Sequence, residues 1–140
     1  MNAIYTAEAI ATGAGRNGRT RTDDGQVDFA LAAPKSLGGS GEGTNPEQLF
    51  AAGYAACFHS ALQLVAREAK ADLGDSSVGA KVGLGRNDNG GFSLQVTLEV
   101  VVPGLSQDEA QALADKAHQV CPYSNAVQGN IDVSVMVSDD

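Results

Sequence analysis

The sequence predicts an α+β fold built around one long helix. Three observations support it: a nearly uncharged helix-like stretch at 49–66, pairs of short strand-like segments on either side of it, and turn residues that separate the elements. The expected order is strand–strand–helix–strand–strand–helix–strand, and hairpin-like strand pairs with one central helix are typical of α+β domains. At 140 residues the chain has about the size of one domain, and we expect a single domain over 1–140.

Two short strands are predicted before the helix, at 5–11 and 27–31. Apolar residues alternate along the second strand and therefore fall on one face of it. The segment between the strands is rich in glycine, and its part at 19–25 is charged and threonine-rich, which indicates a turn. A second glycine-rich loop, at 38–43, leads into the helix.

The central helix is predicted from Pro46 to about Lys70. Asn45 has the side chain of an N-cap, Pro46 suits the first helical position, and Gln48 stands where a capping box places it. Such a helix would be about 37 Å long at 1.5 Å per residue. Because it is apolar nearly all round, it has to be enclosed, and the short strands of one chain could cover only one side well. We therefore expect a homodimer.

The second half of the chain is predicted to hold three strands and two helices. A hairpin should turn at Asn89-Gly90, and Ser106 should cap a helix through a box with Glu109. The expected strands are 78–84, 92–102 and 131–137. One of the expected helices begins at 106, and the other is a short helix at 122–127.

Charge and hydropathy limit the partners of this chain. Nine Lys and Arg against 17 Asp and Glu give a net charge of −8, which argues against nucleic acid and anionic membrane as partners. The first residues resemble no export signal, so we expect a cytoplasmic protein whose cysteines are reduced at rest. The uncharged run 49–65 is near the lower limit for crossing a bilayer, but it includes polar side chains, and we interpret it as a buried helix with no membrane partner.

The two cysteines, Cys57 and Cys121, are the main candidates for chemistry. A zinc site is disfavoured because Cys57 and His59 are two residues apart, which on a helix directs them to nearly opposite sides; we expect no metal and no cofactor. A structural disulfide would close a loop of 64 residues (121 − 57) and stabilise by about 4 kcal/mol, but nothing indicates an oxidising compartment. The pair is therefore interpreted as a redox-active thiol couple.

The residues around each cysteine leave its role open. Phe50 and Tyr54 share the helix face of Cys57, either as core packing or as an apolar substrate pocket beside the thiol. Apolar surroundings raise a thiol pKa, so a reactive Cys57 needs a cation, and Arg16 on its glycine-rich loop is a candidate. Cys121 would cap a short helix and feel its positive end, so local reasoning alone favours Cys121 as the nucleophile.

The glycines around Arg16 also spell G-x-G-x-x-G, at 13–18. A dinucleotide site needs a helix that begins within this motif, so that the helix N-terminus meets the pyrophosphate. The following residues lack a helical pattern, and we do not expect nucleotide binding.

Two longer segments resemble the organic hydroperoxide resistance (Ohr) proteins of the Ohr/OsmC family. They read TNPEQLFAAGYAACF at 44–58 and VCPYSNA at 120–126. Further likeness at 5–7, 11–18 and 37–39 extends the resemblance over essentially the whole chain. The turn before Arg16 carries an extra residue relative to the family, so Arg19 and Arg21 are alternatives to Arg16.

The resemblance implies a bacterial thiol peroxidase and an OsmC/Ohr-like fold, an intertwined homodimer whose long central buried helices are wrapped by antiparallel-rich sheets. It implies that Cys57 is the peroxidatic residue, that Cys121 is the resolving residue, and that Arg16 and Glu47 activate Cys57. The implied substrates are alkyl, aryl and lipid hydroperoxides, and the implied reductant is a protein carrying a dihydrolipoyl group. A non-catalytic dimeric protein that binds small apolar ligands is the alternative.

Helix geometry constrains the implied network. Glu47 and Cys57 are ten residues apart, about 15 Å along a straight helix, so a glutamate at 47 cannot touch the thiol directly. A bend at Gly53 or a glutamate from the partner subunit are possible solutions. Our hypothesis is that Arg16 bridges Glu47 and Cys57 at a subunit interface.

Overall fold

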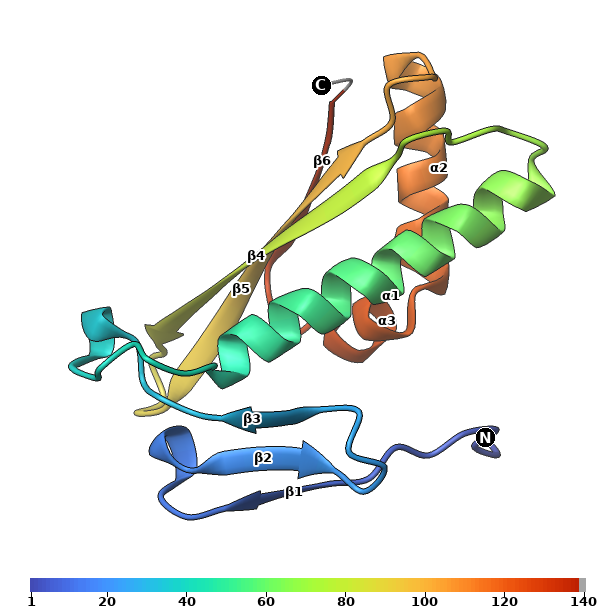
Figure 1. Cartoon of the computed structure of the whole chain (residues 1–140). Helices are drawn as coiled ribbons and strands as arrows, with labels where there is room; N and C mark the ends of the chain where they lie inside the picture. The colour runs from blue at the N-terminus through green and yellow to red at the C-terminus, as the bar shows by residue number, and fades with distance from the viewer. Residues whose placement is uncertain (139–140) are drawn as a thin grey trace. The chain divides into compact units, whose positions relative to one another are not determined.

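The computed structural model describes residues 1–138 (Figure 1). The chain divides into two compact units, the first at Met1–Leu49 and the second from Phe50 onward. The expectation of one domain over the whole chain stays a prediction. The elements are, in order, β1 (Ala9–Thr12), η1 (Gly15–Asn17), β2 (Arg19–Thr22), β3 (Asp28–Ala30), η2 (Lys35–Leu37), α1 (Pro46–Glu68), β4 (Ser77–Arg86), β5 (Phe92–Val101), α2 (Gln107–Val120), α3 (Pro122–Val127) and β6 (Val133–Ser138).

The first unit contains an antiparallel sheet of order β1-β2-β3 (Figure 1). The predicted turn at 19–25 is wrong for its first half, because the middle strand β2 lies there. Threonine alternates with arginine along β2, and β-branched residues at every second position suit a strand that is paired on both sides. The first strand is also shorter than predicted, beginning at Ala9 instead of residue 5.

Glycines shape the connection between β1 and β2. Gly13 and Gly15 have φ angles of 79° and 62°, which side-chain-bearing residues rarely adopt. A Cβ atom at Gly18 would clash with the carbonyl oxygen of Thr12. The motif at 13–18 therefore forms a tight reversal around the 3₁₀ turn η1, which carries Arg16.

Both ends of α1 have identifiable caps. At the N-terminus the Asn45 side chain accepts a hydrogen bond of 2.9 Å from the backbone N–H of Gln48, as predicted. At the C-terminus the N–H of Lys70 binds the carbonyl of Arg67, and the N–H of Ala71 binds that of Ala66. These two bonds form a Schellman motif, and Lys70 takes the left-handed position that glycine usually occupies, with φ 56°.

The second unit contains the sheet β4-β5-β6 (Figure 1). The strands β4 and β5 form the predicted antiparallel hairpin, and the residues 87–91 connect them. In contrast, β5 and β6 are parallel, because α2 and α3 carry the chain back between them.

One hydrophobic cluster joins the central strand of this sheet to the helices. Alternate residues of β5 are buried, at Val96, Leu98 and Val100. The buried residues of the helices are Tyr54, Phe58, Ala61, Leu62, Val65 and Ala66 in α1 and Ala110, Leu113, Ala114 and Ala117 in α2. The predicted α+β class with a long core helix is confirmed, and within one chain only one face of α1 is fully buried.

Helix α1 is long and apolar enough to cross a membrane by length and composition, with a mean hydropathy of 1.4 over the relevant window. Core helices of soluble proteins meet the same criterion. The burial of one face of α1 in the hydrophobic cluster agrees with its interpretation as a core helix.

Candidate active site

The second unit brings the two cysteines together. Their Sγ atoms lie 3.4 Å apart, and both are free thiols. Cys57 comes from the middle of α1 and is partly exposed, whereas Cys121, between α2 and α3, is completely buried. The two positions are 64 residues apart in sequence, so the fold creates this proximity.

The break between α2 and α3 places Cys121. Its backbone N–H still binds the carbonyl of Ala117 at 2.9 Å and so ends α2. Pro122 then occupies the first position of α3 and disfavours a helical conformation for the residue before it. Cys121 accordingly has an extended conformation, with φ −64° and ψ 123°, and serves as the C-cap of one helix and the N-cap of the next.

The N-terminus of α3 lowers the pKa of the Cys57 thiol. Burial raises the pKa of the Cys57 thiol, the backbone N–H of Tyr123 lowers it through a hydrogen bond, and the neighbouring Cys121 raises it again. From the sequence, the positive N-terminal end of α3 was expected to favour a thiolate at Cys121. The first-turn N–H of α3 instead supports a negative charge on Cys57, although burial keeps the pKa of this thiol above its ordinary value.

Three aromatic rings from residues close to the cysteines in the sequence form a cluster. The ring centroids of Phe50, Tyr54 and Tyr123 are 5.7–6.0 Å apart in all three pairs. Tyr54 is completely buried, Phe50 is partly buried, and Tyr123 keeps 39% of its surface exposed. Sequence reasoning named Phe50 and Tyr54 but missed Tyr123, although it stands only two residues after Cys121.

A small apolar cavity opens at Cys57. Its volume is about 390 Å³. It is lined by Cys57, Ser60, Ala61, Leu64, Val120 and Pro122. The predicted substrate-binding residues Phe50 and Tyr54 are not part of this lining.

Polar side chains behind the aromatic cluster form a short hydrogen-bonded chain. The Oγ atom of Ser124 lies 2.7 Å from Oη of Tyr54 and 2.8 Å from Nδ1 of His118. Burial raises the pKa of Tyr54, the bond with Ser124 lowers it, and the charges of Cys121 and Cys57 raise it further. Tyr54 therefore carries a protonated hydroxyl at neutral pH.

The other histidine is not part of this chain. His59 Nε2 lies 2.9 Å from Oγ of Ser76, so this ring nitrogen has a hydrogen-bond partner. Within residues 1–138 no group of three or more His, Cys, Asp or Glu residues could hold a metal ion.

The first unit holds the other two predicted residues, as an ion pair. The guanidinium of Arg16 donates two hydrogen bonds of 2.7 Å to the two carboxylate oxygens of Glu47. The bond with Arg16 holds the pKa of Glu47 below its ordinary value. Arg19, one of the alternatives, is paired instead with Asp28 through two bonds of 2.7 Å.

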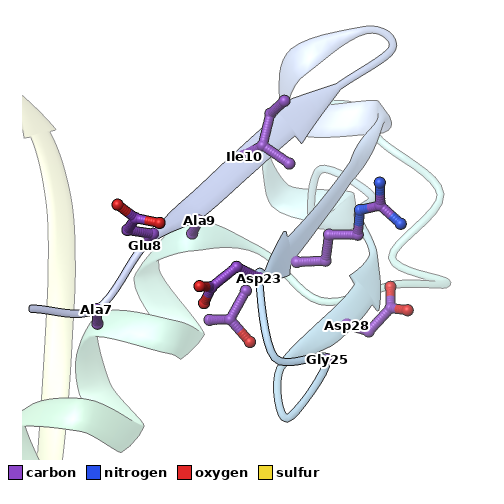
Figure 2. A pocket seen from close by; sticks show the side chains of 9 residues that line it. Ala7, Glu8, Ala9, Ile10, Asp23, Gly25 and Asp28 are labelled. Carbon is purple, nitrogen blue, oxygen red and sulfur yellow. The ribbon is translucent and has the colours of Figure 1, made fainter.

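The first unit also has an open cavity of about 820 Å³ along β1 and the turn after β2 (Figure 2). Arg21, the other alternative, lines it together with Glu8, Asp23 and Asp28. None of the six main candidates lines it, which are Cys57, Cys121, Arg16, Glu47, Phe50 and Tyr54. Ile10 projects from the same strand with 55% of its surface exposed.

The sequence of this chain is similar to those of known proteins of one family. Residues 39–136 match the family model of OsmC-like proteins. The chain is 53% identical over 137 residues to an organic hydroperoxide resistance protein of Xanthomonas axonopodis pv. citri, covering 96% of this chain and 95% of the relative. It is 46% identical over 134 residues to the organic hydroperoxide resistance protein OhrB of Bacillus subtilis, covering 95% and 97%.

Solved structures are similar over the same length. An organic hydroperoxide resistance protein from Elizabethkingia anophelis has a TM-score of 0.95 and 53% identity, with complete coverage of both chains. A similarly described protein from Legionella pneumophila has a TM-score of 0.94 and 53% identity, covering 98% of this chain and 99% of that one.

Proposed function

This chain belongs to the organic hydroperoxide resistance proteins of the OsmC-like family, and we propose that it is a thiol peroxidase that reduces organic hydroperoxides to alcohols. The observation that carries the proposal is the 3.4 Å separation of a partly exposed and a buried thiol. A disulfide needs the two sulfurs to approach by only about 1.4 Å more. The names of the relatives support the class of substrate.

Cys57 is the peroxidatic residue in this proposal. Its thiolate attacks the terminal oxygen of the hydroperoxide, the O–O bond breaks, and the alcohol oxygen leaves, so that Cys57 becomes a sulfenic acid. Its partial exposure, the apolar cavity beside it and the N–H of Tyr123 all support this assignment. Cys121, completely buried, is less suited to meet a substrate first.

Cys121 is the resolving residue. Its thiol attacks the sulfenic sulfur, the hydroxyl leaves as water with the thiol proton, and a disulfide forms. The short distance between the sulfurs supports a fast reaction, which would protect Cys57 from further oxidation. An external dithiol then reduces the disulfide by exchange. We propose a dihydrolipoyl-bearing protein as this reductant and the cytoplasm as the place of action.

Arg16 and Glu47 are proposed to activate Cys57. A guanidinium near the sulfur would favour the thiolate, whose pKa burial otherwise raises, and would stabilise charge on the departing oxygen. The bidentate bond to Glu47 fixes the orientation of Arg16, which supports a positioning role for the carboxylate. We infer that Arg16 extends from this ion pair toward Cys57 during the reaction.

Apolar groups near Cys57 favour organic over inorganic peroxide. The cavity at Cys57 offers Leu64 and Val120, both more than 40% exposed, to an alkyl or aryl group. We propose that Phe50, with Tyr54 behind it, forms an aromatic wall for the same group. Hydrogen peroxide gains nothing from such contacts, because it has no apolar surface to bury.

The first unit supports the proposal of a homodimer. Of its 49 residues only Ala32 and Asn45 are buried, which is too little apolar burial for a stable sheet. Large apolar side chains instead remain exposed on it, among them Ile4, Tyr5, Ile10 and Phe29. A second copy of the chain would cover them and also the open face of α1.

Counting free thiols tests the proposed function. Reduced protein mixed with one equivalent of cumene hydroperoxide should lose both thiols and release one equivalent of cumyl alcohol. Addition of dihydrolipoamide should restore both thiols. A protein that only binds small apolar ligands would keep both thiols and leave the hydroperoxide intact, and this result would refute the proposal.

A further inference from the structure

Ser124 joins the helix of Cys57 to the two helices that meet at Cys121. Its Oγ lies 2.7 Å from Oη of Tyr54 in α1 and 2.8 Å from Nδ1 of His118 in α2. Each of these three residues is three positions away from a cysteine in the sequence. Ser124 is 1% exposed and Tyr54 is completely buried, so solvent does not compete for the bond between them. These three side chains, the Ser124 junction, therefore link α1, α2 and α3 within one helical turn of each cysteine.

Both bonds of the Ser124 junction can form in either state of the His118 ring. A serine hydroxyl can donate one hydrogen bond and accept another. If Nδ1 of His118 accepts, Ser124 donates to it and the Tyr54 hydroxyl donates to Ser124. If Nδ1 carries a proton, it donates to Ser124, which then donates to Tyr54. The junction is therefore a structural link between helices whose presence does not depend on the protonation of the imidazole.

Cys121 lies at a break in the chain, where such a link fixes its place. Its backbone is extended between α2 and α3, and α3 has only six residues. A helix of this length is marginal by itself and is stabilised by its contacts with the rest of the fold. Ser124 lies in the first turn of α3, directly after the break, and its two bonds hold this turn to both longer helices.

The place of Cys121 matters because the reaction between the two sulfurs is sensitive to distance. The Sγ atoms of Cys57 and Cys121 are 3.4 Å apart. Reacting atoms at about 3–3.5 Å are close to a reactive arrangement, and a misplacement of about 1 Å can slow a reaction about a hundredfold. A shift of α3 away from α1 would carry the sulfur of Cys121 out of this range, whereas Cys57 would stay in place on α1.

Slow attack by Cys121 would leave the oxidised Cys57 open to a second oxidation. Cys57 lines an apolar cavity of about 390 Å³, which another hydroperoxide molecule can enter. That molecule would convert the sulfenic acid to a sulfinic acid, which a dithiol does not reduce. The share of turnovers that end in this way therefore depends on how fast Cys121 reacts.

We propose that Ser124 and His118 are positioning residues that hold Cys121 next to Cys57 for the resolving step, with Tyr54 as their anchor on α1. This inference rests on the proposed peroxidase function and concerns its second step. In that step the thiol sulfur of Cys121 bonds to the sulfenic sulfur of Cys57, the S–OH bond breaks, and the hydroxide leaves as water with the thiol proton. Ser124 acts only through the place of Cys121.

The test follows both steps after reduced protein is mixed with cumene hydroperoxide. Rapid quenching in acid and mass spectrometry distinguish sulfenic acid, disulfide and sulfinic acid. Ser124→Ala breaks both bonds of the junction, and we expect it to form the disulfide about tenfold more slowly, as for a misplaced reacting group. The same fraction of sulfinic acid should then appear at an about tenfold lower hydroperoxide concentration, because the two reactions compete for one sulfenic acid. The rate of sulfenic acid formation should change far less.

His118 offers a matched pair of variants at a partly exposed position. In His118→Asn the side-chain amide replaces Nδ1 as a partner of Ser124, whereas His118→Leu is similar in size and has no polar side-chain atom. We expect His118→Leu to slow disulfide formation about two- to tenfold, the effect of one lost hydrogen bond. His118→Asn should form the disulfide at nearly the rate of the unaltered protein.

Two controls separate positioning from a loss of stability. Gln111→Ala removes a hydrogen bond to Asp115 on the surface of α2 and should change neither step. Val100→Ala removes two methyl groups from the buried face of β5 and lowers the free energy of unfolding. It should still form the disulfide at the rate of the unaltered protein.

Three results would overturn the inference. These are disulfide formation at the unaltered rate in Ser124→Ala or His118→Leu, equal slowing in both His118 variants, and equal slowing in Val100→Ala. If Ser124→Ala does not fold, the comparison of His118→Leu with His118→Asn decides alone. If the unaltered protein forms neither sulfenic acid nor disulfide with cumene hydroperoxide, the proposed peroxidase function fails, and the inference fails with it.

Discussion

The side chain of Tyr123 lies against the backbone of α1 at Gly53. A Cβ atom at Gly53 would be 2.9 Å from Oη of Tyr123 and 3.2 Å from its Cε2. Glycine at this helical position therefore leaves room for the ring that completes the aromatic cluster with Phe50 and Tyr54.

Gly53→Ala should displace the Tyr123 ring without unfolding the protein. Tyr123 is 39% exposed and can swing outward, and alanine favours the helix over glycine by about 1 kcal/mol. We expect an unchanged or higher melting temperature. The KM for cumene hydroperoxide should rise roughly two- to tenfold, as for the loss of one aromatic contact of about 0.5–1.5 kcal/mol. Steady-state kinetics that show an unchanged KM would exclude the cluster from substrate binding.

Arg16→Ala should raise the apparent pKa of Cys57 by about one to three pH units, the effect of an adjacent opposite charge. Burial already raises this pKa, so without the cation the thiolate should form only in alkaline solution. In a pH profile of alkylation by iodoacetamide, the reaction of the variant should rise at higher pH than that of the unaltered protein. Coincident profiles would remove Arg16 from the activation of Cys57.

The control for this variant is Arg19→Ala, which breaks a bidentate pair of the same type in the same unit. It should leave the alkylation profile unchanged. Because the Arg16 side chain is 41% exposed, Arg16→Ala should lower the free energy of unfolding by no more than about 1 kcal/mol. The Arg19–Asp28 pair is exposed, and Arg19→Ala should leave this free energy nearly unchanged. The Arg16–Glu47 pair itself should persist at neutral pH and be lost only in acid, as the pH falls through the lowered pKa of Glu47.

The external dithiol should attack the sulfur of Cys57 in the oxidised protein. Cys121 is completely buried, whereas Cys57 borders an open cavity. Attack on the accessible sulfur releases Cys121 as the leaving thiolate. Oxidised protein treated with a monothiol, quenched in acid and digested should carry the mixed disulfide on Cys57. Peptide mapping that finds it mainly on Cys121 would contradict this order of access.

Lys70→Gly should stabilise the protein. Lys70 holds the left-handed position of the Schellman motif with φ 56°, a conformation that costs a side-chain-bearing residue about 1–2 kcal/mol and glycine almost nothing. We expect a gain of about 0.5–1 kcal/mol in urea denaturation. The opposite sign is expected for Arg67→Gly inside α1, a loss of about 1 kcal/mol. A destabilised Lys70→Gly would show that the lysine side chain makes a compensating contact.

Elements with strong local signals could be predicted from the sequence. The caps at Asn45 and Ser106 fixed where two helices begin, and both cap bonds are present. In β5 apolar residues alternate with polar ones, and the buried residues Val96, Leu98 and Val100 all lie on its apolar face. In contrast, β2 was missed because its identity depends on two neighbouring strands and not on its own polar residues. Pairing between strands is a tertiary property, and local propensity does not contain it.

The residues of the candidate site were also only partly predictable from the sequence. The cysteines stood out by their chemistry and sequence motifs, but their 3.4 Å separation depends on the packing of α1 against the break between α2 and α3. Ser124 and Tyr123 were missed because each acquires its role through a partner on another helix. Local dipole reasoning favoured Cys121, and it could not reveal that the N–H of Tyr123 acts on Cys57 instead.

The attack of Cys57 on a hydroperoxide is tested most directly by comparing Cys57→Ser with Cys121→Ser. Each reduced variant is mixed with excess cumene hydroperoxide, and the product is identified by mass spectrometry after trapping with dimedone. Cys121→Ser should consume about one equivalent rapidly and carry a trapped sulfenic acid on Cys57. Cys57→Ser should consume none. A sulfenic acid on Cys121 in the Cys57→Ser variant, with an inert Cys57 in the other, would contradict the account.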